Sequence, residues 1–123
     1  MMECRRGDIY FVDFGRDTES NLQCGIRPAL VVSNNRANEN SPVITVIPLT
    51  ARTYKRPHFP TPVFIPKTSG TGLARNSMAL AEQVSTIDKS CLMEKKGAVT
   101  DLRIMAAVTK ALQIQIGAVE RYN

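Results

Sequence analysis

The stretch CGIRPALVVSNN occupies residues 24–35 and contains four consecutive apolar residues after an arginine and a proline. This run predicts a buried strand over residues 27–33. Proline has no backbone N–H donor, so Pro28 is tolerated only where the strand begins. An arginine gains nothing from packing at the mouth of an apolar strand, because its charge must stay solvated or paired. Packing therefore does not explain Arg27, and either a surface ion pair or a functional role could account for its position.

Short apolar segments on both sides of this stretch predict further strands. They cover residues 9–12, 43–47, 63–65, 77–81 and 84–87. We expect Pro48 to end the strand that begins at Val43, and residues 34–42 to form a turn. Closely spaced strands without intervening helices indicate a mostly antiparallel sheet that coils on itself. The predicted fold is therefore mainly β.

The last part of the chain follows a helical pattern instead. Thr100 is the predicted N-cap, Asp101 is favourable in the first turn, and the helix would end near Gly117. Its apolar stripe has a main set and a flanking set, namely Leu102, Met105, Thr109, Leu112 and Ile116, and Ile104, Val108 and Ala111. We expect this C-terminal α-helix to pack against the sheet, and a stripe this wide could also contribute to a dimer.

The composition is typical of one globular domain spanning residues 1–123, with a hydrophobic share of 43%. No apolar run approaches the roughly 20 residues of a membrane helix, and the N-terminus lacks the apolar segment of a signal peptide. We therefore expect a cytoplasmic protein. The three cysteines form no C-x-x-C pair, and the only histidine is His58, so we expect free thiols, no metal site and no cofactor.

The chain carries a formal net charge of +5. This charge fits a nucleic-acid partner and an ordinary basic domain about equally well. Residues 51–62, ARTYKRPHFPTP, combine cationic and aromatic side chains, which single-stranded nucleic acid requires for its backbone and bases. A solvated connection is the simpler interpretation of this loop.

Six motifs together identify a family. They are RRGDIYFVDFG, GIRPALVVSNN, ITVIPLT, PTPVFI, GLARNSMALAEQVSTIDK and KALQIQIG, and they extend from about residue 6 to residue 118. In this order the chain resembles the MazF/PemK family of toxin endoribonucleases from bacterial toxin–antitoxin pairs. The resemblance implies a small SH3-like β-barrel with a C-terminal helix, acting as a homodimer.

The resemblance also implies an activity. Members of the family cut single-stranded RNA, often mRNA at short motifs, without a metal ion. The 2′-OH attacks the adjacent phosphate and leaves a 2′,3′-cyclic phosphate and a 5′-OH. A cognate antitoxin inhibits by laying a flexible segment across the RNA groove.

Such a reaction requires removal of the 2′-OH proton, stabilisation of the phosphorane and a proton for the leaving oxygen. One histidine excludes a mechanism with two histidines, and the acidic residues are scattered around strand ends. A guanidinium presents a planar fork of donors to phosphate oxygens. By resemblance, Arg27 stabilises the phosphate and Thr50 is the catalytic threonine. Proton donation by Arg27 and the identity of the general base stay open.

Four further residues match family positions in the RNA groove. Gln83 corresponds to a position near the scissile phosphate or a base edge, and Ser77 and Asn34 line the same groove. Glu19 matches an acidic residue of the first loop, which is expected to gate the groove. That loop is longer here than is common in the family, and Ser85 and Cys91 stand where many members carry arginine.

Two other functions remain alternatives. The related CcdB toxins poison DNA gyrase, but their key contacts involve a tryptophan, which this chain lacks. A family member with decayed activity would retain only antitoxin binding. Arg27 could also form a surface ion pair with Glu19 or Asp17, and the Thr50 hydroxyl could serve only to bond the backbone.

Overall fold

The computed structural model describes residues 3–16, 22–52 and 61–120. Glu19, Asp17, His58 and most of the basic loop 51–62 lie outside the described residues, so the expectations attached to them stay predictions. Within the described part of the chain, no helix combines the length and the apolar character needed to span a membrane.

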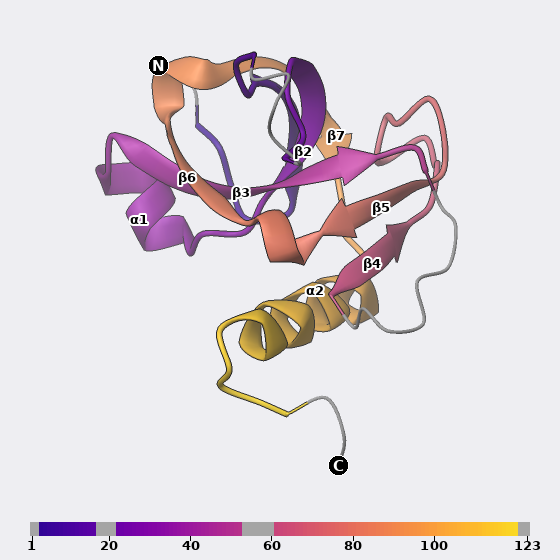
Figure 1. Cartoon of the computed structure of the whole chain (residues 1–123). Helices are drawn as coiled ribbons and strands as arrows, with labels where there is room; N and C mark the ends of the chain where they lie inside the picture. Colours follow the sequence, from indigo (N-terminus) through magenta and orange to yellow (C-terminus); the bar gives the residue numbers. More distant parts are fainter. Residues whose placement is uncertain (1–2, 17–21, 53–60, 121–123) are drawn as a thin grey trace.

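The described residues form a seven-stranded antiparallel sheet in the order β4-β5-β3-β2-β1-β7, with β6 paired to β3 outside this path. The strands are β1 (Asp8–Asp13), β2 (Ile26–Val31), β3 (Val43–Thr50), β4 (Pro62–Ile65), β5 (Ser77–Leu80), β6 (Ser85–Asp88) and β7 (Leu92–Ala98). The helices are α1 (Asn35–Asn40), α2 (Leu102–Gln115) and two short 3₁₀ turns, η1 (Ala81–Gln83) and η2 (Lys89–Cys91). The sheet curls strongly, and α2 lies below β4 and β5 (Figure 1). The prediction of a mainly β fold with a C-terminal helix is confirmed.

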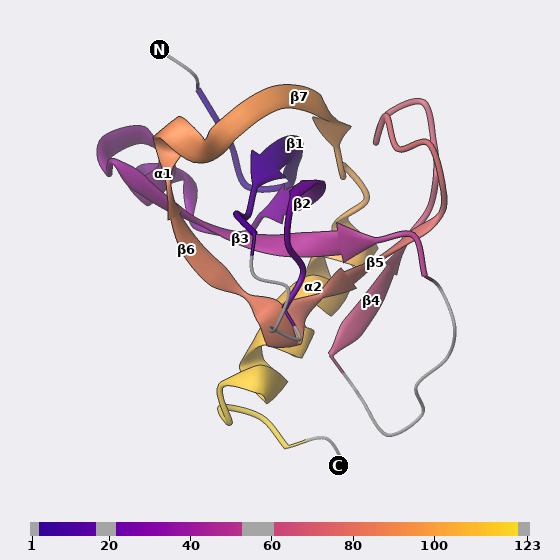
Figure 2. The same ribbon diagram turned by 45° about the horizontal axis from the view of Figure 1, so that its top comes forward.

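A backbone contact brings the two ends of the curled sheet toward each other. The loop between β4 and β5 lies against β7, where the Ala98 amide donates to the Gly70 carbonyl at 2.9 Å. A Cβ atom on Gly72 would lie 2.0 Å from the Lys96 carbonyl oxygen, and one on Gly97 would lie 2.3 Å from that of Gly70. Only glycine allows this approach, which helps to give the sheet its barrel-like shape (Figure 2).

Apolar side chains are buried on both faces of the central strands. Consecutive residues of a strand point to opposite faces, and in β2 Leu30 belongs to one buried cluster while Ala29 and Val31 belong to the other. The first cluster lies between the sheet and α2, and it includes Ile9, Leu30, Ile47, Leu49, Ile65 and Val108. The second includes Tyr10, Val12, Ala29, Val31, Val46 and Leu92. Burial on both faces explains why the apolar run of β2 is continuous rather than alternating.

The predicted end of β3 is wrong, because the strand continues through Pro48 to Thr50. β3 pairs with β2 as far as Pro48 and with β5 from Leu49 onward. Pro48 therefore lies where the strand changes partner, and at that point the missing N–H donor is tolerated. β2 begins at Ile26, so Pro28 is its third residue, and it lies just before Ala29, where the pairing with β3 begins.

An α-helix and a strand of the structure were not predicted from the sequence. Residues 35–40 form the short helix α1 in place of the expected turn, with the Asn34 side chain as its N-cap. β7 has the sequence LMEKKGA, and it pairs with β1 through irregular register shifts at the end of the sheet. Charged residues are common on strands at sheet edges, and here they hide the apolar alternation that would predict a strand.

The predicted face and N-cap of the C-terminal helix both require correction. Asp101, not Thr100, is the N-cap, with its side chain accepting from the Arg103 amide. The buried residues of α2 are Val108 and Ala111 from the flanking set. At the ends of the main set, Leu102 is 83% exposed and Ile116 is 73% exposed, whereas Met105 and Leu112 pack against the core. The buried face is therefore centred on the flanking set.

Candidate active site

A pocket of about 520 Å³ opens where three separate segments of the chain meet. The first is the start of β2 and the residues before it, the second is the end of β3, and the third is the loop that leads into β5. The lining residues are Cys24, Gly25, Ile26, Arg27, Pro28, Leu49, Ala51, Leu73, Ala74, Arg75 and Ser77. Pairing of β3 with β2 and with β5 brings these segments together.

Arg27 is half-buried in the wall of this pocket. Its Nε donates to the Cys24 carbonyl oxygen at 2.7 Å, and it makes no ion pair with any of the described residues. This single backbone hydrogen bond orients the side chain but leaves the charge uncompensated there. The terminal nitrogens of the guanidinium can therefore donate to an acceptor that enters the pocket.

Ser77 and Thr50 stand in different relations to the pocket. Ser77 lines it, and its hydroxyl donates to the Arg75 carbonyl at 2.9 Å. Thr50 is 9% exposed and does not line the pocket, although its neighbours Leu49 and Ala51 do. Its hydroxyl oxygen accepts from the Arg52 amide at 3.3 Å. The structure thus brings Arg27 and Ser77 to one pocket and places Thr50 directly beside it.

Gln83 lines a second pocket of about 280 Å³. The residues around this pocket are Asp13, Phe14, Leu22, Gln23, Pro48, Gln83, Ser85 and Ile87. The Gln83 Oε1 atom accepts from the Gln23 amide at 2.8 Å, so the segment before β2 is bound to η1. Gln23 and Cys24 are consecutive and line the second and first pocket respectively, as do Pro48 and Leu49. Both pockets are therefore lined in part by β3 and by the segment before β2.

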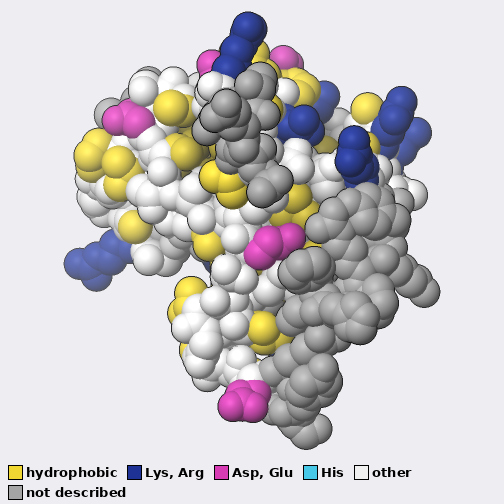
Figure 3. Space-filling model, viewed as in Figure 1, with side chains coloured by type: hydrophobic (Ala, Val, Ile, Leu, Met, Phe, Trp, Pro, Cys, Tyr) yellow, Lys and Arg dark blue, Asp and Glu magenta, His cyan; other side chains and the backbone are white. Residues whose placement is uncertain are grey.

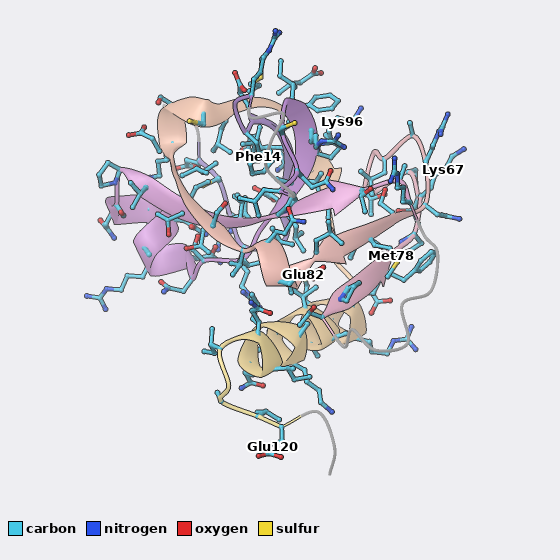
Figure 4. All side chains as sticks on the ribbon, in the orientation of Figure 1. Phe14, Lys67, Met78, Glu82, Lys96 and Glu120 are labelled. Atoms are coloured by element: carbon cyan, nitrogen blue, oxygen red, sulfur yellow. The ribbon has the colours of Figure 1, made fainter. Side chains whose placement is uncertain are left out.

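Phe14 is a residue of the second pocket that was not predicted as part of the site. It follows β1 directly, is labelled in Figure 4 and packs against the second core cluster, and the same pocket contains the Gln83 amide and the Asp13 carboxylate. An aromatic side chain in a pocket with an amide and a carboxylate has the groups needed to stack on and hydrogen-bond a nucleobase. The signal was an aromatic residue between a strand and a polar loop, which sequence alone does not separate from a core residue.

The structure does not bring Asn34 to either of these pockets. Its Oδ1 accepts from the Ala37 amide at 2.8 Å as the N-cap of α1. It lines a separate surface pocket with Arg36, Ala37, Asn40 and Ser41. The observed contact of Asn34 is therefore structural, and Glu19 lies outside the described residues.

The electrostatic character of the first pocket is one-sided. Arg27 and Arg75 both line it, and none of its lining residues is acidic. Across residues 3–16, 22–52 and 61–120, no group of three or more His, Cys, Asp or Glu side chains is arranged to hold a metal ion. The pocket is suited to an anion.

The clear pKa shifts of the described residues lie away from this pocket. Burial raises the pKa of the Cys4 thiol and of the Tyr10 phenol. Hydrogen bonds from the backbone of Ser90 and Arg103 lower the pKa of Asp88 and Asp101 respectively. These four groups lie in the second core cluster or at the starts of η2 and α2, so their pKa shifts have structural causes.

The sequence pattern of the family described as the PemK-like, MazF-like toxin of type II toxin-antitoxin systems matches residues 5–116. The chain belongs to this toxin family. The MazF-like chain is 37% identical over 113 residues to Endoribonuclease MazF of Staphylococcus saprophyticus, which covers 92% of this chain and 91% of the relative. It is 38% identical over 119 residues to Endoribonuclease EndoA of Bacillus subtilis, which covers 97% of this chain and 99% of the relative.

Solved structures agree with this MazF-like assignment. An endoribonuclease from mycobacterial species, solved in complex with its cognate antitoxin, matches with a TM-score of 0.69 and 26% identity over 95% of this chain and 96% of that one. MazF of Deinococcus radiodurans matches with a TM-score of 0.78 over 95% of this chain and 99% of that one. Its identity of 22% shows the fold alone. The expected MazF-like fold is confirmed.

Proposed function

We propose that this chain is the toxin of a type II toxin–antitoxin pair and that it cleaves single-stranded RNA, including mRNA, at selected sequences without a metal ion. The chain is an endoribonuclease of the MazF-like family. The observation that carries the proposal is the first pocket, where Arg27 is held by one backbone hydrogen bond and no lining residue is acidic. An mRNA substrate places the proposed action in the cytoplasm.

The proposed reaction is an internal transesterification. The 2′-OH oxygen loses its proton to a base and attacks the adjacent phosphorus, and the bond from phosphorus to the 5′-oxygen breaks. The products are a 2′,3′-cyclic phosphate and a 5′-OH, once the leaving oxygen has gained a proton. Negative charge develops on the phosphorane, and the terminal nitrogens of Arg27 would donate to its oxygens. The general base stays unassigned.

Thr50 and Ser77 support the same site. The Thr50 hydroxyl is beside the pocket and accepts from the Arg52 amide, and its proton makes no hydrogen bond with the described residues, so it could bond a phosphate oxygen or the 2′-oxygen. Ser77 is 5% exposed and lines the pocket with its hydroxyl tied to the Arg75 carbonyl. We assign Thr50 to catalysis, and Ser77, whose hydroxyl oxygen can still accept from a ribose 2′-OH, to binding of the RNA backbone.

Gln83 is proposed as a residue that reads a base. Its pocket shares β3 and the segment before β2 with the first one, and its amide has both a donor and an acceptor. The hydrogen bond from the Gln23 amide occupies the acceptor in the structure, so the segment before β2 must move for full access. Asn34 and Glu19 stay predictions for RNA contact.

Two protein partners belong to the proposal. Structural neighbours include a mycobacterial endoribonuclease and MazF of Deinococcus radiodurans, each solved with its antitoxin, which supports an antitoxin partner for this chain. A homodimer would cover apolar side chains that the single chain exposes, among them Phe64, Leu102 and Ile116.

The function is tested by incubating the purified protein with a long mixed-sequence RNA in EDTA and mapping the new ends. We expect cleavage at recurrent sequences, with 5′ ends that a kinase can phosphorylate directly because they carry a hydroxyl. Cleavage that requires added magnesium, or new 5′-phosphate ends, would contradict the mechanism. A protein that binds its antitoxin but leaves RNA intact would instead be the decayed family member.

A further inference from the structure

Arg75 lines the same pocket as Arg27 but is exposed rather than half-buried. Its guanidinium has no hydrogen bond or ion pair with the described residues, and the pocket offers it no carboxylate. Two guanidinium groups without a counter-charge in one pocket repel each other and are stabilised by bound anions. We propose that Arg75 is a second phosphate-binding residue, which holds an RNA phosphate next to the one at Arg27. This inference rests on the proposed function.

Hydrogen bonds within the loop that carries Arg75 hold its backbone in place. The Thr68 amide donates to the Thr71 hydroxyl oxygen at 3.0 Å, and that hydroxyl donates to the Pro66 carbonyl at 3.1 Å. The Lys67 amide donates to Asn76 Oδ1 at 2.8 Å, which joins the two ends of the loop. Because the loop backbone is already ordered, only the side chain of Arg75 loses freedom when it binds an anion.

The same loop is anchored on the side that faces β7. Gly72 lies against the Lys96 carbonyl, and the buried Leu73 belongs to the first core cluster, which packs against α2. These contacts place Arg75 two residues after a fixed backbone position and two residues before Ser77, which also lines the pocket. The position of the Arg75 backbone is therefore set by the fold rather than by a mobile loop.

Basic side chains surround this region of the molecule. Lys and Arg side chains gather at the upper right in Figure 3, where Figure 4 labels Lys96 and Lys67. Lys67 lies at the start of the loop that carries Arg75, and Lys96 adjoins its middle. A surface of one sign attracts a polyanion and concentrates it at the pocket.

The two arginines differ in a way that predicts different roles. Arg27 is held by the Cys24 carbonyl in the pocket wall, which suits a group that must meet charge as it develops. Arg75 has no such restraint at its side chain and is more exposed. A contact that is equally strong before and during the reaction lowers KM without raising kcat. We therefore expect Arg75 to contribute to affinity and Arg27 to contribute to rate.

The test separates affinity from rate. Binding is measured by fluorescence anisotropy with a labelled, mixed-sequence 2′-O-methyl RNA, which cannot be cleaved because it has no free 2′-OH. Single-turnover cleavage is measured with the unmodified RNA of the same sequence. The proteins are wild type, Arg75→Ala, Arg75→Lys and, as a matched control, Arg36→Ala, which removes another exposed arginine from a different surface pocket.

We expect Arg75→Ala to weaken binding about tenfold, as loss of a charged hydrogen bond predicts. The slope of log affinity against log salt should fall by roughly 0.7 for the one lost phosphate contact on a single strand. The saturated cleavage rate should change by less than about twofold, since the contact does not change in the transition state. Arg75→Lys should retain most of the salt slope, and Arg36→Ala should match wild type.

Two results would overturn the proposal. In one, Arg75→Ala binds the 2′-O-methyl RNA as tightly as wild type does. In the other, its saturated cleavage rate falls as much as that of Arg27→Ala, which would place Arg75 on the reacting phosphate itself. If wild type neither binds nor cuts RNA, the proposed function fails as well, so the two failures are distinguishable.

Discussion

At the scale of single residues, the direction of Arg27 depends on the backbone just before it. The Arg27 Nε donates to the Cys24 carbonyl, and the next residue, Gly25, has a φ of +77°. The Gly25 carbonyl accepts from the Phe14 amide, and its own amide donates to Gly15. A residue with a Cβ atom adopts this left-handed conformation less readily. The tight connection at Gly25 therefore orients the carbonyl that holds the guanidinium.

Substitution of Gly72 should destabilise the fold through one close backbone contact. In Gly72→Ala the new Cβ atom would lie 2.0 Å from the Lys96 carbonyl oxygen, at a φ of +67°. We expect the free energy of unfolding to fall by about 2 kcal/mol or more, because backbone must move to relieve the contact. Urea unfolding at fixed protein concentration measures this change.

Gly70→Ala is the matched control in the same loop. Its Cβ atom would meet only the Thr68 hydroxyl oxygen, at 3.8 Å. We expect a change within about 0.5 kcal/mol. Equal effects of the two substitutions would show that the contact between the loop and β7 does not determine stability.

At the scale of elements, the start of α2 depends on Asp101. The Asp101 side chain accepts from the Arg103 amide at 2.9 Å, and this hydrogen bond lowers the pKa of the carboxyl group below its ordinary value of 3.8. A carboxyl group with a lowered pKa in the folded state stabilises the fold above its unfolded pKa. That stabilisation is lost as the pH falls through the folded pKa, so the N-terminal end of α2 should be least stable at acidic pH.

This pH dependence is tested by comparing Tm for wild type and Asp101→Asn from about pH 6 down to about pH 3. Asparagine keeps a cap acceptor but does not titrate. We expect the difference in Tm to favour wild type near neutral pH and to shrink as the pH falls below 4. Curves that stay parallel over the whole range would show that the Asp101 charge contributes nothing.

Elements with buried, apolar residues were predictable from sequence, and elements at the periphery were not. The strands around Ile9, Leu30 and Ile44 follow from their apolar runs, because both faces of the central sheet are buried. β7 could not be predicted, since its register is set by β1 and its outer residues are charged. The buried face of α2 was misplaced because Leu102 and Ile116 are apolar yet exposed.

At the scale of the whole molecule, the candidate active site is a product of tertiary structure. The unusual position of Arg27 raised the question of its role, and the family resemblance supplied Arg27, Thr50 and Ser77 as expected site residues. Arg75 and the walls of the pocket could not be predicted. They depend on the register that pairs Thr50 of β3 with Met78 of β5, and on the loop between β4 and β5 that closes against β7. No local sequence pattern predicts this strand register or this contact between the loop and β7.

The charges of the whole molecule favour binding of a polyanion. The chain has a net charge of +5, and the pocket combines two arginines with no acidic lining residue. The pocket lies where the segments before β2, after β3 and before β5 converge. The proposed RNA substrate would meet both arginines, Arg27 and Arg75, in this one pocket.

The central claim is that the reaction takes place at Arg27 in this pocket. Its most direct test is the single-turnover rate of RNA cleavage by Arg27→Ala, at protein concentrations that saturate the RNA. We expect a rate about 10²–10³-fold below wild type, as for loss of a donor that stabilises developing charge. Arg27→Lys should also be slow, because lysine keeps the charge but lacks the planar fork. Cleavage by Arg27→Ala at the wild-type rate, at the same positions in the RNA, would contradict the claim.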